Sequence, residues 1–121
     1  MTDLSFGVIV QNDKKQILFH KNRIAPKYSL PEEKAPSDLK VSKAVPEKIK
    51  RDSGISVDVL EFFGIRQEKG IHLIFICKAK SDIDKAKKKD FRWVEIEKSL
   101  GLDLPESSRI ALEAYFEKKK L

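Results

Sequence analysis

The segment "SLPEEKAPSDLKVSKAVPEKIKRDSGI", residues 29–55, decides the fold, because it joins a proline-rich connection to a helix that stops at a glycine. The connection, residues 21–38, contains three prolines and shows no apolar period. Long irregular segments of this kind often carry binding or catalytic residues. We therefore expect the functional residues to lie in this connection and in the helix that follows it.

The helix is expected over residues 37–53. Ser37 and Asp38 are good N-cap residues, and Gly54 is a good C-terminal stop because glycine adopts the left-handed conformation without strain. Pro46 interrupts the pattern, since a proline inside a helix removes one hydrogen bond and costs about 3 kcal/mol. Either the helix bends ahead of Pro46, or its regular part begins near this residue.

Three charged residues of the helix lie close to its apolar face. On a helical wheel, Lys48 and Asp52 fall within the apolar sector and Arg51 lies at its edge. Two interpretations stay open. Lys48 and Asp52 form an ion pair at the edge of the core, or the three residues line a charged groove beside the sheet. The apolar sector itself consists of Val41, Ala44, Val45 and Ile49.

Short apolar runs on both sides of this segment predict strands. The first two strands are expected to form a hairpin across the turn at 11–15, and Gly64 is expected to mark a β-bulge. A second helix is expected near the C-terminus, with Pro105 in its first turn. This order of elements is typical of a single α/β domain over residues 1–121 with a mixed or antiparallel sheet. The expected strands cover 6–10, 16–21, 55–67, 71–80 and 91–96, and the second helix covers 104–120.

The composition limits the partners and the compartment. The 121 residues carry a formal charge of +6, which favours an anionic partner such as a nucleotide, a phosphorylated metabolite or RNA, although a solvated lysine-rich surface explains the same charge. No apolar run is long enough to cross a membrane, so no membrane partner is expected. Cys77 is the only cysteine, which excludes an intramolecular disulfide and fits a reducing cytoplasm.

The loop–helix segment resembles the signature box of the Nudix hydrolases, G-x5-E-x7-R-E-U-x-E-E-x-G-U, in which U is aliphatic. Leu30 and Pro31 stand where the family's Leu-Pro turn begins, and Ile49, Gly54 and Ile55 match the aliphatic, glycine and aliphatic positions of the box. The resemblance extends over nearly the whole chain. It implies a Nudix-type α/β/α sandwich, with a mixed β-sheet between the box helix and a C-terminal helix.

The positions of the box that carry its chemistry depart from the family's pattern. An ion pair between Glu47 and Arg51 would keep the family's arginine–glutamate pair with its ends exchanged. The replacements, in box order, are Glu32 and Glu33 for the glycines of the turn, Asp38 or Leu39 for the first glutamate, Glu47 for the arginine, Lys48 for the glutamate beside it, and Arg51 and Asp52 for the later pair of glutamates.

In the family, the helix glutamates hold divalent cations that neutralise a diphosphate and activate water. Lys48 and Arg51 would repel such an ion, so the resemblance implies that no metal cofactor binds and that normal Mg²⁺-dependent pyrophosphohydrolase activity is lost. An active hydrolase of a nucleoside diphosphate derivative, using Mg²⁺ or Mn²⁺, would need a rearranged site. The acids available for it are Glu32, Glu33, Asp38 and Asp52 as metal ligands, with Glu68 as catalytic base.

The residues favour an inactive member of the family that binds a nucleotide or another phosphorylated small molecule. Lys48 and Arg51 would hold phosphate oxygens in place of the cations. A third class is a non-catalytic interaction module for protein or RNA, and the sequence gives no oligomeric state. The expected ligand-binding residues are Arg23, Lys27, Tyr28, Glu33, Lys48 and Arg51, with Tyr28 either a stacking face or a core residue.

Overall fold

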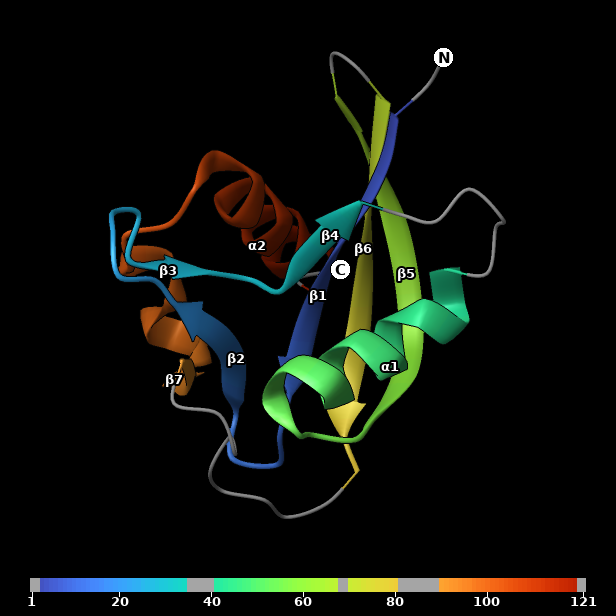
Figure 1. Cartoon of the computed structure of the whole chain (residues 1–121). Coiled ribbons are helices and arrows are strands. Elements are labelled where there is room, and N and C mark those ends of the chain that lie inside the picture. The colour runs from blue at the N-terminus through green and yellow to red at the C-terminus, as the bar shows by residue number, and fades with distance from the viewer. Residues whose placement is uncertain (1–2, 35–40, 68–69, 81–89, 120–121) are drawn as a thin grey trace.

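The computed structural model describes residues 3–34, 41–67, 70–80 and 90–119. The apolar runs form a mixed sheet with the strand order β3-β2-β1-β6-β5, in which β4 also pairs with β1 and β7 also pairs with β2 (Figure 1). The strands are β1 (Asp3–Gln11), β2 (Gln16–Lys21), β3 (Tyr28–Ser29), β4 (Glu32–Lys34), β5 (Val57–Gln67), β6 (Gly70–Ala79) and β7 (Phe91–Glu95).

Alternating residues of the strands face two separate cores. In β1, Phe6 and Val8 pack into the core beneath helix α1 (Val41–Ser53), whereas Ile9 packs into the core beneath helix α2 (Glu106–Lys119). The two helices therefore cover opposite faces of the sheet, as Figure 1 shows. This arrangement confirms the expected α/β/α sandwich with a mixed sheet.

The strands β1 and β6 form the centre of the sheet. They run parallel and pair without interruption from Asp3 opposite Gly70 to Gln11 opposite Lys78. The expected hairpin between β1 and β2 is present, but its strands pair only at Gln11 and Ile17. Nearer the start of β1, Ser5, Phe6 and Gly7 pair with β4 instead.

The connection after β2 is less irregular than the sequence suggests, because it contains β3 and β4. The three residues of β4 are all charged, so they lack the apolar alternation from which a strand is predicted. Their backbone pairs with Ser5, Phe6 and Gly7 of β1. Because β1 and β4 are far apart in the sequence, the residues of β4 alone do not indicate this pairing.

One further expectation is wrong in detail, and one element was not predicted. The sheet is irregular between Val59 and Glu61, and Gly64 pairs in register with Leu73, so the bulge lies elsewhere than predicted. A 3-10 helix, η1 (Ile96–Gly101), follows β7 and was not expected. Pro105 immediately precedes the first residue of α2.

Helix α1 runs through Pro46, so its regular part does not begin at the proline. Its end is as expected, because Gly54 has a φ of 82° and its N–H donates to the carbonyl oxygen of Lys50 at 2.9 Å. The expected N-cap residues Ser37 and Asp38 lie outside the described residues.

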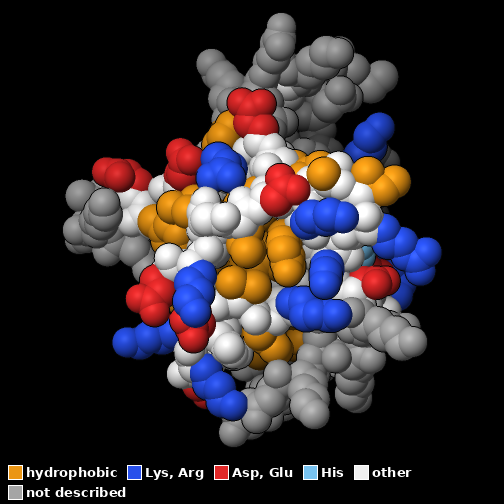
Figure 2. Space-filling model, turned by 90° about the vertical axis from the view of Figure 1, so that its left-hand side faces the viewer, with side chains coloured by type: hydrophobic (Ala, Val, Ile, Leu, Met, Phe, Trp, Pro, Cys, Tyr) orange, Lys and Arg blue, Asp and Glu red, His pale blue; other side chains and the backbone are white. Residues whose placement is uncertain are grey.

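In the described part of the chain, neither α-helix combines the length and the apolar content needed to cross a bilayer. Figure 2 shows the side of the molecule that carries β2, β3 and η1. On this face, Lys and Arg side chains lie on both sides of a central apolar area, and they gather most closely on the right of the view.

Candidate functional site

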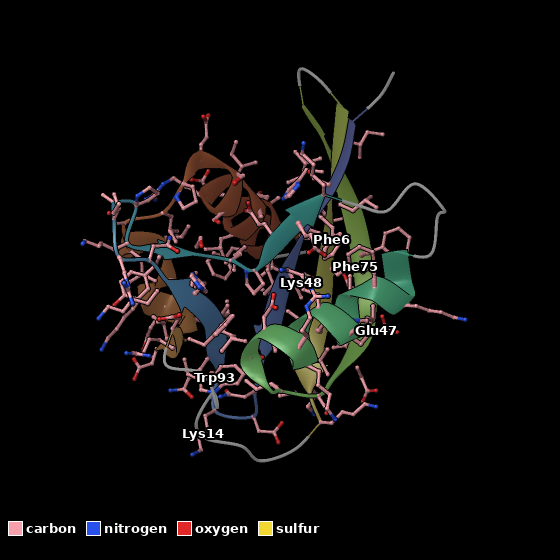
Figure 3. All side chains as sticks on the ribbon, viewed as in Figure 1. Phe6, Lys14, Glu47, Lys48, Phe75 and Trp93 are labelled. Atoms are coloured by element: carbon pink, nitrogen blue, oxygen red, sulfur yellow. The ribbon has the colours of Figure 1, made fainter. Side chains whose placement is uncertain are left out.

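Lys48 lies at the centre of a compact cluster of charges between α1 and β4. Its ammonium is 2.7 Å from Oδ2 of Asp52 and 3.9 Å from Oε1 of Glu33, and its side chain is only 11% exposed. Figure 3 shows Lys48 on the side of α1 that faces the sheet. The contact with Asp52 confirms the interpretation of an ion pair at the edge of the core.

Arg51 joins the same cluster from the solvent side. Its guanidinium lies 3.4 Å from Glu33 and 3.3 Å from Asp52, and its side chain is 64% exposed. Among the described residues no ion pair links Arg51 to Glu47, so the exchanged arginine–glutamate pair does not form. We call Glu33, Lys48, Arg51 and Asp52 the α1 charge cluster.

The two cations dominate the electrostatics of Asp52. Burial raises the pKa of its carboxyl group, but the hydrogen bond and the charge of Lys48, followed by those of Arg51, outweigh burial and hold the pKa below its ordinary value of 3.8. Asp52 is therefore an ionised partner of Lys48 at neutral pH.

The α1 charge cluster fits a divalent cation poorly. Both carboxylates, Glu33 and Asp52, already contact an ammonium or a guanidinium. Over residues 3–34, 41–67, 70–80 and 90–119, no group of three or more His, Cys, Asp and Glu side chains is arranged to hold a metal ion. Two candidates, Asp38 as a ligand and Glu68 as a base, lie outside the described residues.

Glu32 does not belong to the α1 charge cluster, because it points to the opposite face of the sheet. Its carboxylate accepts hydrogen bonds from the hydroxyl groups of Ser107 at 2.9 Å and Ser108 at 3.1 Å, both in the first turn of α2. The Ser108 hydroxyl also accepts the N–H of Leu30 at 3.0 Å. Glu32 therefore joins β4 to α2 and is separated by the sheet from Asp52.

A buried histidine completes this second polar group. Nδ1 of His72 shares a 2.6 Å hydrogen bond with the hydroxyl of Ser5, and its Nε2 lies 4.0 Å from the carboxylate of Glu32. Nε2 is buried and has no hydrogen-bond partner among the described residues. A Cβ at Gly7 would meet this nitrogen at 3.0 Å, so glycine makes room for the ring. The sequence analysis missed His72 because its partners come from other elements, far along the chain.

The remaining expected ligand residues lie elsewhere. Arg23, Lys27 and Tyr28 line an open depression of about 600 Å³ beside the connection between β2 and β3. Tyr28 is half-buried and packs against the core beneath α2, which agrees with its role as a core residue. We call this hollow the basic depression, and it is lined by Lys21, Asn22, Arg23, Lys27, Tyr28, Asp90 and Arg92. The structure thus divides the expected ligand residues between two places.

Comparison with solved structures identifies the fold. The chain is similar to the E. coli ORF135 protein, with a TM-score of 0.73 and 15% identity over 98% of this chain and 91% of that one. It is similar to a NUDIX hydrolase from Nitrosomonas europaea, with a TM-score of 0.76 and 15% identity over 98% and 72% of the two chains. It is also similar to the MutT protein from Methanosarcina mazei Go1, with a TM-score of 0.70 and 19% identity over 99% and 96%.

No protein-family model and no curated protein matches the sequence. The likeness to solved structures nevertheless shows that the chain has the fold of the Nudix hydrolases, as the loop–helix segment predicted. At identities this low, a shared fold carries no statement about activity, which depends on the residues of the site.

Proposed function

We propose that this Nudix-fold chain lacks metal-dependent hydrolysis and binds a nucleotide or another phosphorylated small molecule at the α1 charge cluster. The observation that carries the proposal is the 2.7 Å ion pair between Lys48 and Asp52. It supports the proposal because the resemblance aligns this largely buried ammonium with a metal-binding glutamate of the family.

The electrostatic cost of a metal ion beside Lys48 is large. Two unit charges about 4 Å apart interact with about 4 kcal/mol at an effective dielectric constant of about 20, and a divalent ion doubles this repulsion. Asp52 cannot offset it, because its carboxylate already neutralises Lys48 and contacts Arg51. In an active relative, Mg²⁺ or Mn²⁺ would supply the Lewis acid and the activated water.

Arg51 is the group through which a phosphate would enter the cluster. Its contact with Glu33 joins side chains that are 64% and 43% exposed, and ion pairs this exposed contribute only about 0–1 kcal/mol. A phosphate with two negative charges can displace Glu33 and accept a bidentate pair of hydrogen bonds from the guanidinium. Lys48 keeps its ion pair with Asp52, and its ammonium adds positive charge on the less exposed side of the cluster.

Calorimetric titration tests both parts of the proposal. We expect no saturable binding of Mg²⁺ or Mn²⁺, no metal-dependent turnover of ADP-ribose, and metal-independent binding of ADP-ribose. Binding of the nucleotide should weaken in Arg51→Ala and persist in Lys50→Ala, a neighbouring cation that is exposed on α1 and donates to Ser56.

Three results would overturn the proposal in distinct ways. Turnover with Mg²⁺ would establish a rearranged active site. Tighter binding to single-stranded RNA than to any small ligand would favour the nucleic-acid interaction module. No response to either ligand class would leave a protein-binding scaffold as the better explanation.

A further inference from the structure

We infer that the basic depression is a second anion site, which binds an oligophosphate chain independently of the α1 charge cluster. The hollow of about 600 Å³ lies at the end of β2, where the chain turns into β3. Its volume falls within the range of about 300–1,000 Å³ that is usual for small-molecule sites. Its chemistry, its rigidity and its position each support the inference.

The depression has an excess of positive charge. Among the described residues that line it, four are cations, Lys21, Arg23, Lys27 and Arg92, and one is a carboxylate, Asp90, so the formal charge of this described lining is +3. Within the described part of the chain, no ion pair neutralises Lys21, Arg23 or Lys27. The α1 charge cluster differs in this respect, because its two cations face two carboxylates.

The loop that presents these cations is held in place by hydrogen bonds within itself. The side-chain amide of Asn22 donates to the carbonyl oxygen of Pro26 at 2.8 Å, and its backbone N–H donates to the carbonyl oxygen of Lys27 at 2.7 Å. Nδ1 of His20 donates to the side-chain oxygen of Asn22 at 2.7 Å. The ammonium of Lys27 donates to the carbonyl oxygen of Arg23 at 3.0 Å.

Asp103 ties the same loop to the segment that precedes α2. Its carboxylate accepts the N–H of Lys27 at 2.9 Å, and its carbonyl oxygen accepts the N–H of Tyr28 at 3.0 Å. A preorganised loop loses little conformational freedom when an anion binds, so more of the interaction energy contributes to affinity. In this arrangement the carboxylate of Asp103 serves as an acceptor for the backbone of the loop.

The depression and the α1 charge cluster belong to opposite faces of the sheet. Arg92 lies directly across from Phe19, and Lys21 lies directly across from Tyr28. Directly paired residues share a face, and both Phe19 and Tyr28 belong to the core beneath α2. The gathering of cations on the face that carries β2 and β3 is visible in Figure 2. A ligand in the depression therefore does not reach Lys48 or Arg51.

An oligophosphate is the ligand class that suits this arrangement. Guanidinium groups bind phosphate oxygens in a bidentate manner, and lysines add charge without fixed geometry. Three to four negative charges of a diphosphate or triphosphate would match the net charge of the lining. Tyr28 lines the depression and packs on the core, and we assign the binding to the phosphates and not to a base.

Calorimetric titration of the whole chain, at low salt and with EDTA present, tests this site. The probes are inorganic tripolyphosphate, ATP and adenosine. We expect tripolyphosphate and ATP to bind and adenosine not to bind. Arg23→Glu and Lys27→Glu should each weaken binding of tripolyphosphate by about tenfold or more, because each reverses a contacting charge.

Two control variants separate this site from the rest of the molecule. Lys80→Glu changes the net charge equally at the opposite end of the sheet and should leave tripolyphosphate binding within about twofold. The second variant is Arg51→Glu, which removes the phosphate contact proposed for the α1 charge cluster; in this background tripolyphosphate should still bind, and Arg23→Glu should still weaken that binding. If Arg51→Glu abolishes binding and Arg23→Glu does not, the depression is not a site and the proposed function stands. Equal effects of all charge reversals, or a preference for single-stranded RNA over tripolyphosphate, would also overturn this inference.

Discussion

Glu32 and Glu33 are consecutive residues of β4 whose carboxylates lie on opposite faces of the sheet. Glu33 contacts Lys48 and Arg51 on α1, whereas Glu32 accepts hydrogen bonds from Ser107 and Ser108 on α2. The alternation of a strand separates them, although the sequence suggests a paired acidic site. One of the two acids is therefore part of the candidate ligand site, and the other joins β4 to the second helix.

The first prediction concerns the stability contributed by these two acids. Glu32→Ala should lower the free energy of unfolding by about 1–3 kcal/mol, because it removes the acceptor of two serine hydroxyls in a partly buried position. Glu33→Ala should lower it by at most about 1 kcal/mol, because its ion pairs are exposed. Urea denaturation of both variants measures the difference. Equal losses would contradict the assignment of the two faces.

The second prediction concerns acid sensitivity. Because the folded-state pKa of Asp52 lies below its ordinary value of 3.8, its stabilising contribution is present above about pH 3.8 and is lost as the pH falls through the folded-state pKa. Lys48→Met removes the main cause of the low pKa. The stability difference between wild type and Lys48→Met should shrink as the pH is lowered from about 6 to about 3. A constant difference over that range would refute the ion pair as its source.

The third prediction concerns the buried His72. Burial lowers the pKa of its imidazole below the ordinary value of 6.5, and the charge of Glu32 opposes this effect. A base with a lowered folded-state pKa stabilises the fold above the unfolded-state value, so the contribution of His72 declines as the pH falls below about 6.5. An NMR titration of the ring protons should give a pKa below 6.5, and Glu32→Gln should lower it further. A value at or above 6.5 would show that Glu32 outweighs burial.

The fourth prediction concerns Cys77. Burial, with a smaller contribution from the charge of Asp58, raises the pKa of its thiol to about 12. Because the thiolate is the reactive form, iodoacetamide should modify Cys77 very slowly in the folded protein at about pH 8. Concentrated guanidinium chloride should restore the rate of an ordinary thiol. Rapid labelling of the folded chain would mean that the central strand β6 opens frequently.

The fifth prediction is a gain of metal binding. The double variant Lys48→Glu/Arg51→Glu puts carboxylates at the two positions beside Asp52 that the resemblance aligns with glutamates of the Nudix box, and we expect it to bind Mn²⁺ measurably. The control Lys43→Glu/Lys50→Glu makes the same change in net charge on exposed positions of α1 and should bind no Mn²⁺. If both variants bind alike, the gain reflects net charge and not a coordination site.

The parts of this arrangement that depend on local spacing could be predicted from the sequence. Lys48 and Asp52 are four residues apart on one helix, and Gly54 ends that helix, so both features follow from helical geometry. The strand β4 could not be predicted, because three charged residues form a strand only through pairing with β1. Without that register, nothing in the sequence separates Glu32 from Glu33.

The separation of the expected ligand residues into two places could not be predicted from the sequence either. Arg23 and Lys27 lie in the connection that leads into the box, and the sequence groups them with Lys48 only as expected ligand-binding residues. The pairing of β2 with β3 and β7 instead directs the basic depression to the α2 side of the sheet. Only the three-dimensional register supplies this information.

We propose above all that helix α1 of this Nudix fold does not support a divalent cation. Calorimetric titration of the wild-type chain with Mn²⁺, at neutral pH and with ADP-ribose present, tests it most directly. We predict no saturable heat of metal binding. Saturable binding of Mn²⁺ that is lost in Asp52→Asn would contradict the account, because it would show that Asp52 serves a metal ion and not Lys48.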